Sequence, residues 1–302
     1  MRADELLERV ASVRRELLRR GEFLPPGWVE EAVEDLRRER LTGFVLPEAD
    51  GAAIGFLSRR PARGYGHVHV EPGADGVGRT TVLLQRLIES LPVAIDRADF
   101  GLTGLTPVEE AELVRTFPRN RASGFLTRLS VERPVGGAAD SVLPLLPAPL
   151  HHWPVRSVPL DALHALDWAA FRGTADATLV ADTPEENRQM LGELLDGRLG
   201  MFLDDASTAL ADDEGRPVGA ILVAQQSTAR AIVLDLMVDP VGRRRGIGSY
   251  LMRWSIRALH ALGYQAVTLW VTESNAPARH LYDQLGFTPR MTALILRWQR
   301  GP

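Results

Sequence analysis

The sequence predicts an α/β protein made of two tandem domains, each a central mixed sheet with helices on both faces. Three observations lead to this prediction. The chain has 302 residues, about twice the length of a common domain. Helical and extended patterns alternate along it. The order of patterns in the first half returns in the second at a period of roughly 165 residues, which indicates a duplicated domain rather than a solenoid.

The first half opens with two helical patterns and continues with three extended segments, a glycine-rich turn and a further helix. A last helix and a last strand complete it. In chain order these elements are expected at residues 4–20, 26–40, 42–46, 53–58, 66–70, 73–78, 80–90, 107–117 and 124–133.

A proline-rich stretch, residues 134–154, shows no helical period and is the best candidate for a linker. It predicts a first domain at 1–134, a linker at 135–154 and a second domain at 155–302. The second half then repeats the order of the first. Its elements are expected at residues 160–171, 183–195, 208–211, 218–225, 231–238, 243–248 (the turn), 247–262 (the helix that the turn opens), 267–271, 274–287 and 286–298.

Short sequence matches support the duplication. Val70-Glu71-Pro72 precedes the first turn as Val238-Asp239-Pro240 precedes the second, and Gly76-Val77-Gly78 parallels Gly246-Ile247-Gly248. Each half ends in a strand that begins with a Gly-Phe pair. These matches fall at equivalent points of the two halves, so the two halves are expected to share one fold.

The composition is that of an ordinary globular protein, with 45% hydrophobic and 25% charged residues. No apolar run approaches the roughly 18 residues of a membrane span. The first residues lack the apolar core of a signal peptide. We therefore expect a cytoplasmic protein without a membrane partner.

The ionisable residues exclude several chemistries. All 35 basic residues are arginine, and 39 acidic residues give a net charge of −4, which does not favour a nucleic-acid partner. The chain has no cysteine, which removes disulfides, thiolate zinc sites and cysteine nucleophiles. The histidine pairs at 67/69 and 151/152 lack a third ligand at metal spacing, so no metal is expected.

The most informative segment is the turn after the strand at 231–238. Arg243, Arg244 and Arg245 precede Gly246-Ile247-Gly248 and a helix. Backbone N–H groups at a helix N-terminus have no partner and attract anions. Glycines leave these groups accessible, and arginines add charge. The segment favours a pyrophosphate ligand, although a solvated arginine run beside a glycine-tolerant loop is the alternative.

A second segment, Ser274 to Phe287, reads as a short helix. Ser274 or Asn275 is suited to the N-cap, Pro277 lies in the first turn, and Gly286 follows the end. Tyr282 lies on this helix, and taken alone it would more often be a core aromatic than a catalytic residue.

Together the two segments resemble the GCN5-related N-acetyltransferase family. Its pyrophosphate motif, Arg/Gln-x-x-Gly-x-Gly/Ala, is matched by residues 243–248. Its later motif, Asn-x-x-Ala-x-x-Leu-Tyr followed by Gly-Phe, is matched by Asn275, Ala278, Leu281, Tyr282, Gly286 and Phe287. The resemblance covers residues 155–298 well and the first half only in outline.

The resemblance implies acetyl-CoA as the donor, lying between two splayed strands. Its pyrophosphate would bind the turn, its pantetheine arm would bind the preceding strand, and Tyr282 would be the general acid that protonates the leaving thiolate. An acceptor amine would attack the thioester directly in a ternary complex. The implied cofactor-binding residues are Leu236, Met237, Val238, Arg243, Arg244, Arg245, Gly246, Ile247, Gly248, Ser249 and Asn275.

The general base is left open between Asp235, Glu273 and water. Asp235 stands in an otherwise apolar strand, where aspartate is disfavoured unless something requires it. Alternation along the strand would place its side chain on the face of Val233 and Met237, within reach of an acceptor groove. Partial desolvation would raise its pKa and suit it to proton abstraction. A strand-end charge bonded to a neighbouring loop is the alternative.

The first half contains a segment, Gly73 to Thr80, that looks like a nucleotide-binding P-loop with arginine in place of lysine. The chain has no lysine, so we interpret the segment instead as a degenerate copy of the acetyl-CoA turn. Gly73 stands where the leading arginine of the motif belongs, and the helix at 107–117 offers no matching tyrosine. We expect this half to lack catalysis of its own.

The predicted function is transfer of an acetyl group from acetyl-CoA to a primary amine of a small molecule. The alternative is a non-catalytic acyl-CoA-binding or sensing module. The sequence does not name the acceptor. The protein is expected to be a monomer whose two domains form a pseudo-dimer, or a homodimer.

Overall fold

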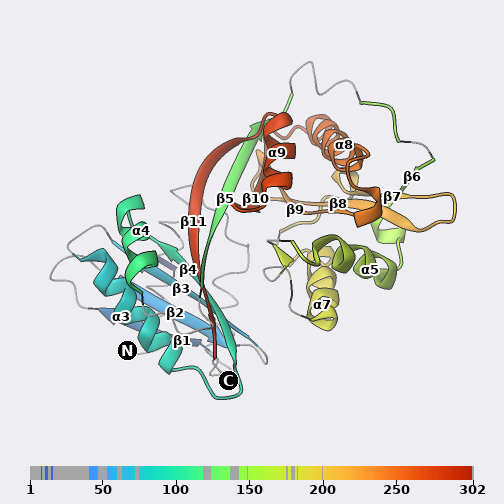
Figure 1. The fold of residues 1–302 in the computed structure, drawn as a ribbon. Coiled ribbons are helices and arrows are strands. Elements are labelled where there is room, and N and C mark those ends of the chain that lie inside the picture. The colour runs from blue at the N-terminus through green and yellow to red at the C-terminus, as the bar shows by residue number, and fades with distance from the viewer. Residues whose placement is uncertain are drawn as a thin grey trace. The chain divides into compact units, whose positions relative to one another are not determined.

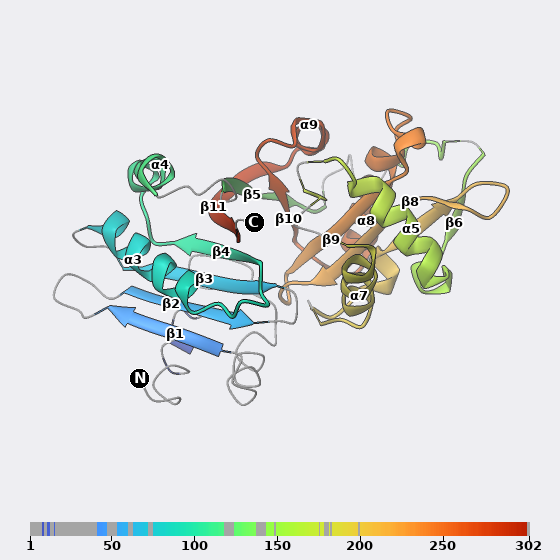
Figure 2. The same ribbon diagram turned by 60° about the horizontal axis from the view of Figure 1, so that its bottom comes forward.

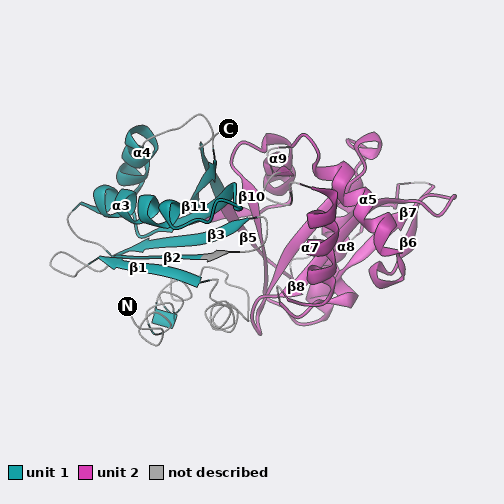
Figure 3. Cartoon of the chain, turned by 90° about the horizontal axis from the view of Figure 1, so that it is seen from below, with its two compact units in different colours: residues 1–128, 292–302 teal, residues 129–291 magenta. Residues whose placement is uncertain are grey.

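The computed structural model describes residues 8, 11, 12, 15, 41–46, 53–59, 63–71, 75–117, 124–136, 143–147, 149–174, 176–177, 181, 183–198 and 200–300. They fall into two compact units. Unit 1 contains residues 1–128 and 292–302, and unit 2 contains residues 129–291 (Figure 3). The two predicted N-terminal helices lie outside the described residues, apart from four helical positions in the first of them.

Unit 1 is a mixed sheet in the order β1-β2-β3-β4-β11 (Figure 1). The first three strands are antiparallel, β3 and β4 are parallel, and β4 and β11 are antiparallel. Helix α3 packs on the sheet through Leu83, Leu84 and Leu87, which are fully buried with Phe100. The elements are β1 (Leu41–Leu46), β2 (Ala53–Arg59), β3 (Gly64–Val70), α3 (Gly76–Glu89), β4 (Arg97–Thr103), α4 (Pro107–Thr116) and the start of β5 (Gly124–Pro134).

Unit 2 is a mixed sheet in the order β5-β10-β9-β8-β7-β6. From β6 to β9 each strand is antiparallel to the next. Strands β9 and β10, which helix α8 connects, are parallel, as the strand, turn, helix, strand pattern predicts. The elements are β6 (His151–Trp153), α5 (Leu160–Phe171), α7 (Pro184–Leu195), β7 (Thr208–Ala211), β8 (Pro217–Gln225), β9 (Arg230–Val238), α8 (Ile247–Ala261), β10 (Ala266–Thr272), α9 (Ala276–Gln284) and the start of β11 (Thr288–Gln299).

Helices cover both faces of the unit 2 sheet (Figures 1 and 2). On one side, Leu163, Leu166 and Ala170 of α5 and Leu191 of α7 form one buried cluster with Met237 of the sheet. On the other side a separate core joins α8 to the sheet through residues such as Ile247, Leu251 and Val233. Apolar residues on both faces of β8 and β9 account for the continuous apolar runs of these strands.

The compact units differ from the predicted domains at 1–134 and 155–302 because β5 and β11 are each divided between the units. Residues 294–299 of β11 pair with β4, and Leu294, Leu296 and Trp298 belong to the core of unit 1. Residues 129–134 of β5 belong to unit 2. Sequence order does not reveal how β5 and β11 are divided between the units, because an edge strand offers the same unpaired backbone groups to any strand that reaches it.

Two strands were not predicted. Strand β4 has the alternating burial of a strand with one covered face, but Asp99 and Gly101 interrupt its apolar pattern. Strand β6 has three residues and lies inside the predicted linker, where it pairs with β7. No helix among the described residues is long and apolar enough to cross a membrane.

Candidate active site

Strands β9 and β10 separate after their first three residues. Arg230, Ala231 and Ile232 of β9 pair with Ala266, Val267 and Thr268 of β10, and the pairing ends there. Strand β9 nevertheless continues to Val238 and β10 to Thr272. Residues 233–238 thus have β8 on one side and no paired strand on the other. The resulting V-shaped opening matches the splayed strands that the sequence resemblance implied.

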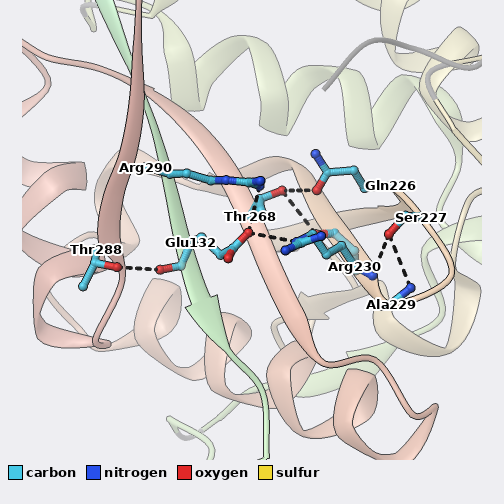
Figure 4. Close-up of polar contacts among 9 residues, drawn as sticks. Glu132, Gln226, Ser227, Ala229, Arg230, Thr268, Thr288 and Arg290 are labelled. Atoms are coloured by element: carbon cyan, nitrogen blue, oxygen red, sulfur yellow. Dashed lines mark hydrogen bonds and ion pairs between the residues drawn. The ribbon is translucent and has the colours of Figure 1, made fainter. Parts of the chain in front are cut away.

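Polar contacts brace the closed end of this V (Figure 4). The Glu132 carboxylate of β5 accepts hydrogen bonds from Arg230 Nε at 3.1 Å and Arg290 Nη1 at 2.9 Å. At the last paired position, Thr268 Oγ1 donates to Gln226 Oε1 at 2.7 Å. Since one carboxylate holds two guanidinium groups from different strands, these contacts tie β5, β9 and β11 of unit 2 together below the opening.

A β-bulge lies in β9 just above the last paired residues. Leu222 of β8 faces Asp235, but the next residue, Val223, faces Val233, so Leu234 is the extra residue. A bulge breaks the alternation of faces. Asp235 therefore shares the α5 face with Met237, whereas Val233 belongs to the α8 core. The prediction that Asp235 shares a face with Val233 was wrong for this reason.

The register with β8 decides which backbone groups of β9 face the opening. Asp239 N–H donates to Val218 O at 3.0 Å, so residue 239 points toward β8. Along an antiparallel pair the direction alternates. Met237 consequently directs its backbone groups to β8, while Leu236 and Val238 direct theirs into the opening. Of the three residues predicted to hold a pantetheine arm, two direct their backbone groups into the opening.

The turn from residue 243 to 249 carries a run of backbone N–H groups without partners. Gly246 is the N-cap of α8, with φ +81°, and Arg244 has φ +61°. No described residue accepts a hydrogen bond from the N–H groups of residues 244–249, whereas the next amide, Tyr250, bonds to Gly246 O. Successive free amides at a helix N-terminus form an anion-binding concavity.

The three arginines of the turn differ in their contacts. A guanidinium nitrogen of Arg243 donates to Ala170 O at the end of α5, which commits this side chain to holding the turn on α5. Arg244 and Arg245 are exposed and form no ion pair with any described acidic group. Their charge is therefore available to a phosphate.

The second motif lies against the turn. A Cβ placed on Gly248 would be 3.3 Å from Leu281 of α9 and 3.7 Å from Val238. Asn275 caps α9 by accepting from Ala278 N–H at 3.3 Å, as predicted, and its Nδ2 donates to Asp176 Oδ2 at 2.6 Å. Gly286 has φ +81° directly after the C-cap, a conformation that suits glycine.

Tyr282 is half-buried on α9. Its ring meets the Phe287 ring edge-on at a centroid distance of 5.8 Å and packs on the α8 core. This packing involves the ring of the side chain. The two predicted motifs are thus brought together by the fold, with the turn, α9 and the end of β9 in one place.

The two candidate bases differ in environment. Glu273 is exposed at the end of β10. Asp235 is buried and lies against Asp167 of α5, a residue that sequence reasoning missed. Burial, and then the Asp167 charge, raise the pKa of Asp235 well above its usual value. Asp167 had a sequence signal, because it occupies a position on the apolar face of its helix beside Leu163, Leu166 and Ala170.

The described residues of unit 1 do not repeat the features of this site. Strands β3 and β4 pair without interruption from Gly64 and Ala98 to His69 and Thr103, and β2 pairs with β3 without a bulge. The Asp75 carboxylate accepts from Gly78 N–H at 2.9 Å and so occupies the helix N-terminus itself. In place of an opening, His67 and His69 both contact Thr103 Oγ1, at 2.9 Å and 3.0 Å.

Comparisons with known proteins agree with this geometry. The model of the acetyltransferase (GNAT) family matches residues 160–287. A mycothiol acetyltransferase of Clavibacter michiganensis is 34% identical over 276 residues, covering 85% of this chain and 80% of that protein. A mycothiol acetyltransferase of Frankia casuarinae is 28% identical over 245 residues, covering 77% of this chain and 67% of that protein.

Two solved structures share the fold. A GCN5-related N-acetyltransferase from Sphaerobacter thermophilus has a TM-score of 0.60 at 17% identity, covering 90% of this chain and 86% of its own. A tandem GNAT protein from the clavulanic acid biosynthesis pathway has a TM-score of 0.54 at 16% identity, with coverage of 93% and 86%. The sequence relatives and the matched family model together show that this chain belongs to the GCN5-related N-acetyltransferase (GNAT) family and is an acetyltransferase.

Proposed function

We propose that unit 2 transfers an acetyl group from acetyl-CoA to a primary amine of a small molecule. The observation that carries this proposal is the run of unpartnered amides at residues 244–249, placed at the mouth of the β9–β10 opening. A diphosphate fits these donors, and a linear amide-containing arm fits the unpaired edge of β9.

In this proposal each part of the donor has its own set of residues. The pyrophosphate binds the amides of residues 244–249, with Arg244 and Arg245 adding charge and Arg243 holding the turn on α5. The pantetheine arm bonds to Leu236 and Val238, with Asn275 beside it. Acetyl-CoA supplies an activated thioester. Tyr282 donates its hydroxyl proton to the sulfur as the acceptor amine displaces it.

The relatives' name makes a mycothiol-related amine the first acceptor to test. Acetyl-CoA binding would be measured by calorimetry, and CoA release by a thiol assay with a panel of primary amines that includes the amine precursor of mycothiol. Binding and turnover are expected. Absence of acetyl-CoA binding would overturn the proposal. Binding without turnover on any amine would favour the alternative, a sensing module.

We further expect one acetyl-CoA site per chain, because in the described part of unit 1 β3 and β4 pair without an opening and the Asp75 carboxylate caps the start of α3. Calorimetry should give one equivalent of acetyl-CoA. Asp75→Asn should leave the affinity unchanged, since its side-chain oxygen still caps α3. Two equivalents, or a weakened affinity in this variant, would contradict the assignment. Gly78→Glu is a poorer test of the turn in unit 1 than Asp75→Asn. The Cβ of the new side chain would lie 2.1 Å from the Asp75 carboxylate and clash with it.

A further inference from the structure

Two buried carboxyl groups face each other beneath the opening. Asp167 of α5 is fully buried, and Asp235 at the bulge of β9 is 6% exposed. Their side chains are within hydrogen-bonding reach of one another. Asn187 Nδ2 of α7 donates to Asp167 Oδ2 at 2.6 Å. Asp167 Oδ1 and Asp235 Oδ1 have no donor among the described residues.

Two carboxylates cannot satisfy each other in this arrangement. Each oxygen is an acceptor only, and two negative charges removed from water repel strongly. A single proton placed between the two carboxyl groups removes both problems at once, because one group becomes a donor and one charge disappears. The arrangement needs no cation and no cavity.

We propose that Asp167 and Asp235 share one proton, carried mainly by Asp235, and that the pair is a positioning device that fixes the β9 bulge against α5. The Leu236 N–H lies against the Asp235 carboxyl, so the pair also sets the direction of a backbone group that faces the opening. The positioning role in catalysis rests on the proposed function. The shared proton does not.

The surrounding charges place the proton on Asp235. Burial raises the pKa of Asp167 as well, but the hydrogen bonds from Asn187 and Asp235 and the nearby His164 of α5 oppose that rise. The Asp176 carboxylate adds negative potential at Asp235. Asp176 is itself held by Thr272 and Asn275. Asp235 is therefore the donor and Asp167 the acceptor.

This assignment gives Asp235 a role different from the base predicted from the sequence. A protonated carboxyl cannot accept a proton from an ammonium group, which leaves Glu273 or water for that step. The two roles predict opposite results for Asp235→Asn, because an amide still donates to Asp167 but cannot act as a base.

The first test compares Asp235→Asn with Asp235→Leu in turnover. If the two carboxyl groups share a proton, the Asp235→Asn variant should keep kcat within about threefold of the natural protein. The Asp235→Leu variant leaves Asp167 without a donor, so its kcat should fall further than that of the Asn variant. Loss of about a hundredfold or more in the Asn variant would identify a base and overturn the proposal. Acetyl-CoA binding to the natural protein, measured separately, tests the proposed function alone.

The second test is thermal unfolding between pH 5 and pH 9 without acetyl-CoA. In the folded protein the pKa of Asp235 is raised, so the unfolded chain loses this proton at lower pH than the folded one. Stability must then fall as pH rises above the unfolded value, by up to a tenfold change in the unfolding constant per pH unit for one proton, until the folded group ionises. In Asp235→Asn the dependence of the unfolding constant on pH should be weaker, by the contribution of one proton. An unchanged slope would overturn the shared proton.

Discussion

Gly248→Glu is expected to lose acetyl-CoA binding while the fold is retained. The new Cβ would meet only Leu281 at 3.3 Å and Val238 at 3.7 Å, so the fold has room for it after a small adjustment of the Leu281 side chain. A carboxylate in the first turn of α8 is favourable for the helix itself. The same carboxylate, however, would occupy the site proposed for the pyrophosphate and repel its negative charge. We expect the Kd to rise roughly a hundredfold or more, about 2.8 kcal/mol.

The measurement is calorimetry together with the melting temperature in excess acetyl-CoA. At a free concentration of a hundred times Kd the natural protein should gain about 2.7 kcal/mol of stability, and the variant should gain almost none. Gly192→Glu is the matched control, because it adds the same charge to α7 of the same unit, where a Cβ meets nothing within 4 Å. An undiminished shift in Gly248→Glu would show that the anion seat lies elsewhere.

The parts of this site that lie within one continuous segment could be predicted from the sequence. The beginning of α8 depends on Gly246, which alone tolerates its positive φ without strain, and the cap of α9 depends on the Asn275 side chain. Both effects act within three or four residues of chain. Local chemistry therefore identified the turn, α9 and its N-cap, whereas the predicted helix from Ser274 to Phe287 is longer than α9 at both ends.

The opening between β9 and β10 could not be predicted in the same way. The opening arises because the two strands stop pairing after Thr268, although both have strong strand patterns to their ends. The bulge at Leu234 is likewise a property of the β8–β9 register. Register depends on packing across the sheet, and a one-residue shift moves a side chain to the other face. That shift is why the surroundings of Asp235 were misjudged.

The partner of Asp235 shows a further limit. Asp167 lies 68 positions earlier in the chain, on a helix whose other buried residues are apolar. A lone aspartate on such a face indicates an unusual environment, but it does not identify the residue that contacts the aspartate. The fold alone brings the two carboxyl groups together.

In unit 1 the sequence predicts a degenerate turn, and two features of the structure bear on this prediction. Asp75 supplies the anion that a phosphate would otherwise supply, within three residues of the amide that it caps. The uninterrupted β3–β4 pairing then removes the space for a pantetheine arm. Each change alone would weaken a site, and the two changes act on different parts of the same ligand.

Tyr282→Phe is expected to lower kcat by roughly a hundredfold or more while acetyl-CoA binding persists. The ring is held by Phe287 and the α8 core, so phenylalanine should occupy the same place and only the hydroxyl group is lost. If that hydroxyl protonates the leaving thiolate, its loss acts on the chemical step and leaves the packing of the ring intact. Steady-state kinetics with the acceptor, and calorimetry with acetyl-CoA, separate the two effects.

Tyr264→Phe is the matched control for this variant. Tyr264 is also half-buried against the α8 core of unit 2, so the same atom is removed from a similar packing environment. It should change neither kcat nor affinity appreciably. Equal kcat in Tyr282→Phe and the natural protein would remove Tyr282 from the reaction, whereas equal losses in both variants would mean that the hydroxyl groups support the core and not the chemistry. Only a loss confined to position 282 assigns the proton to this residue.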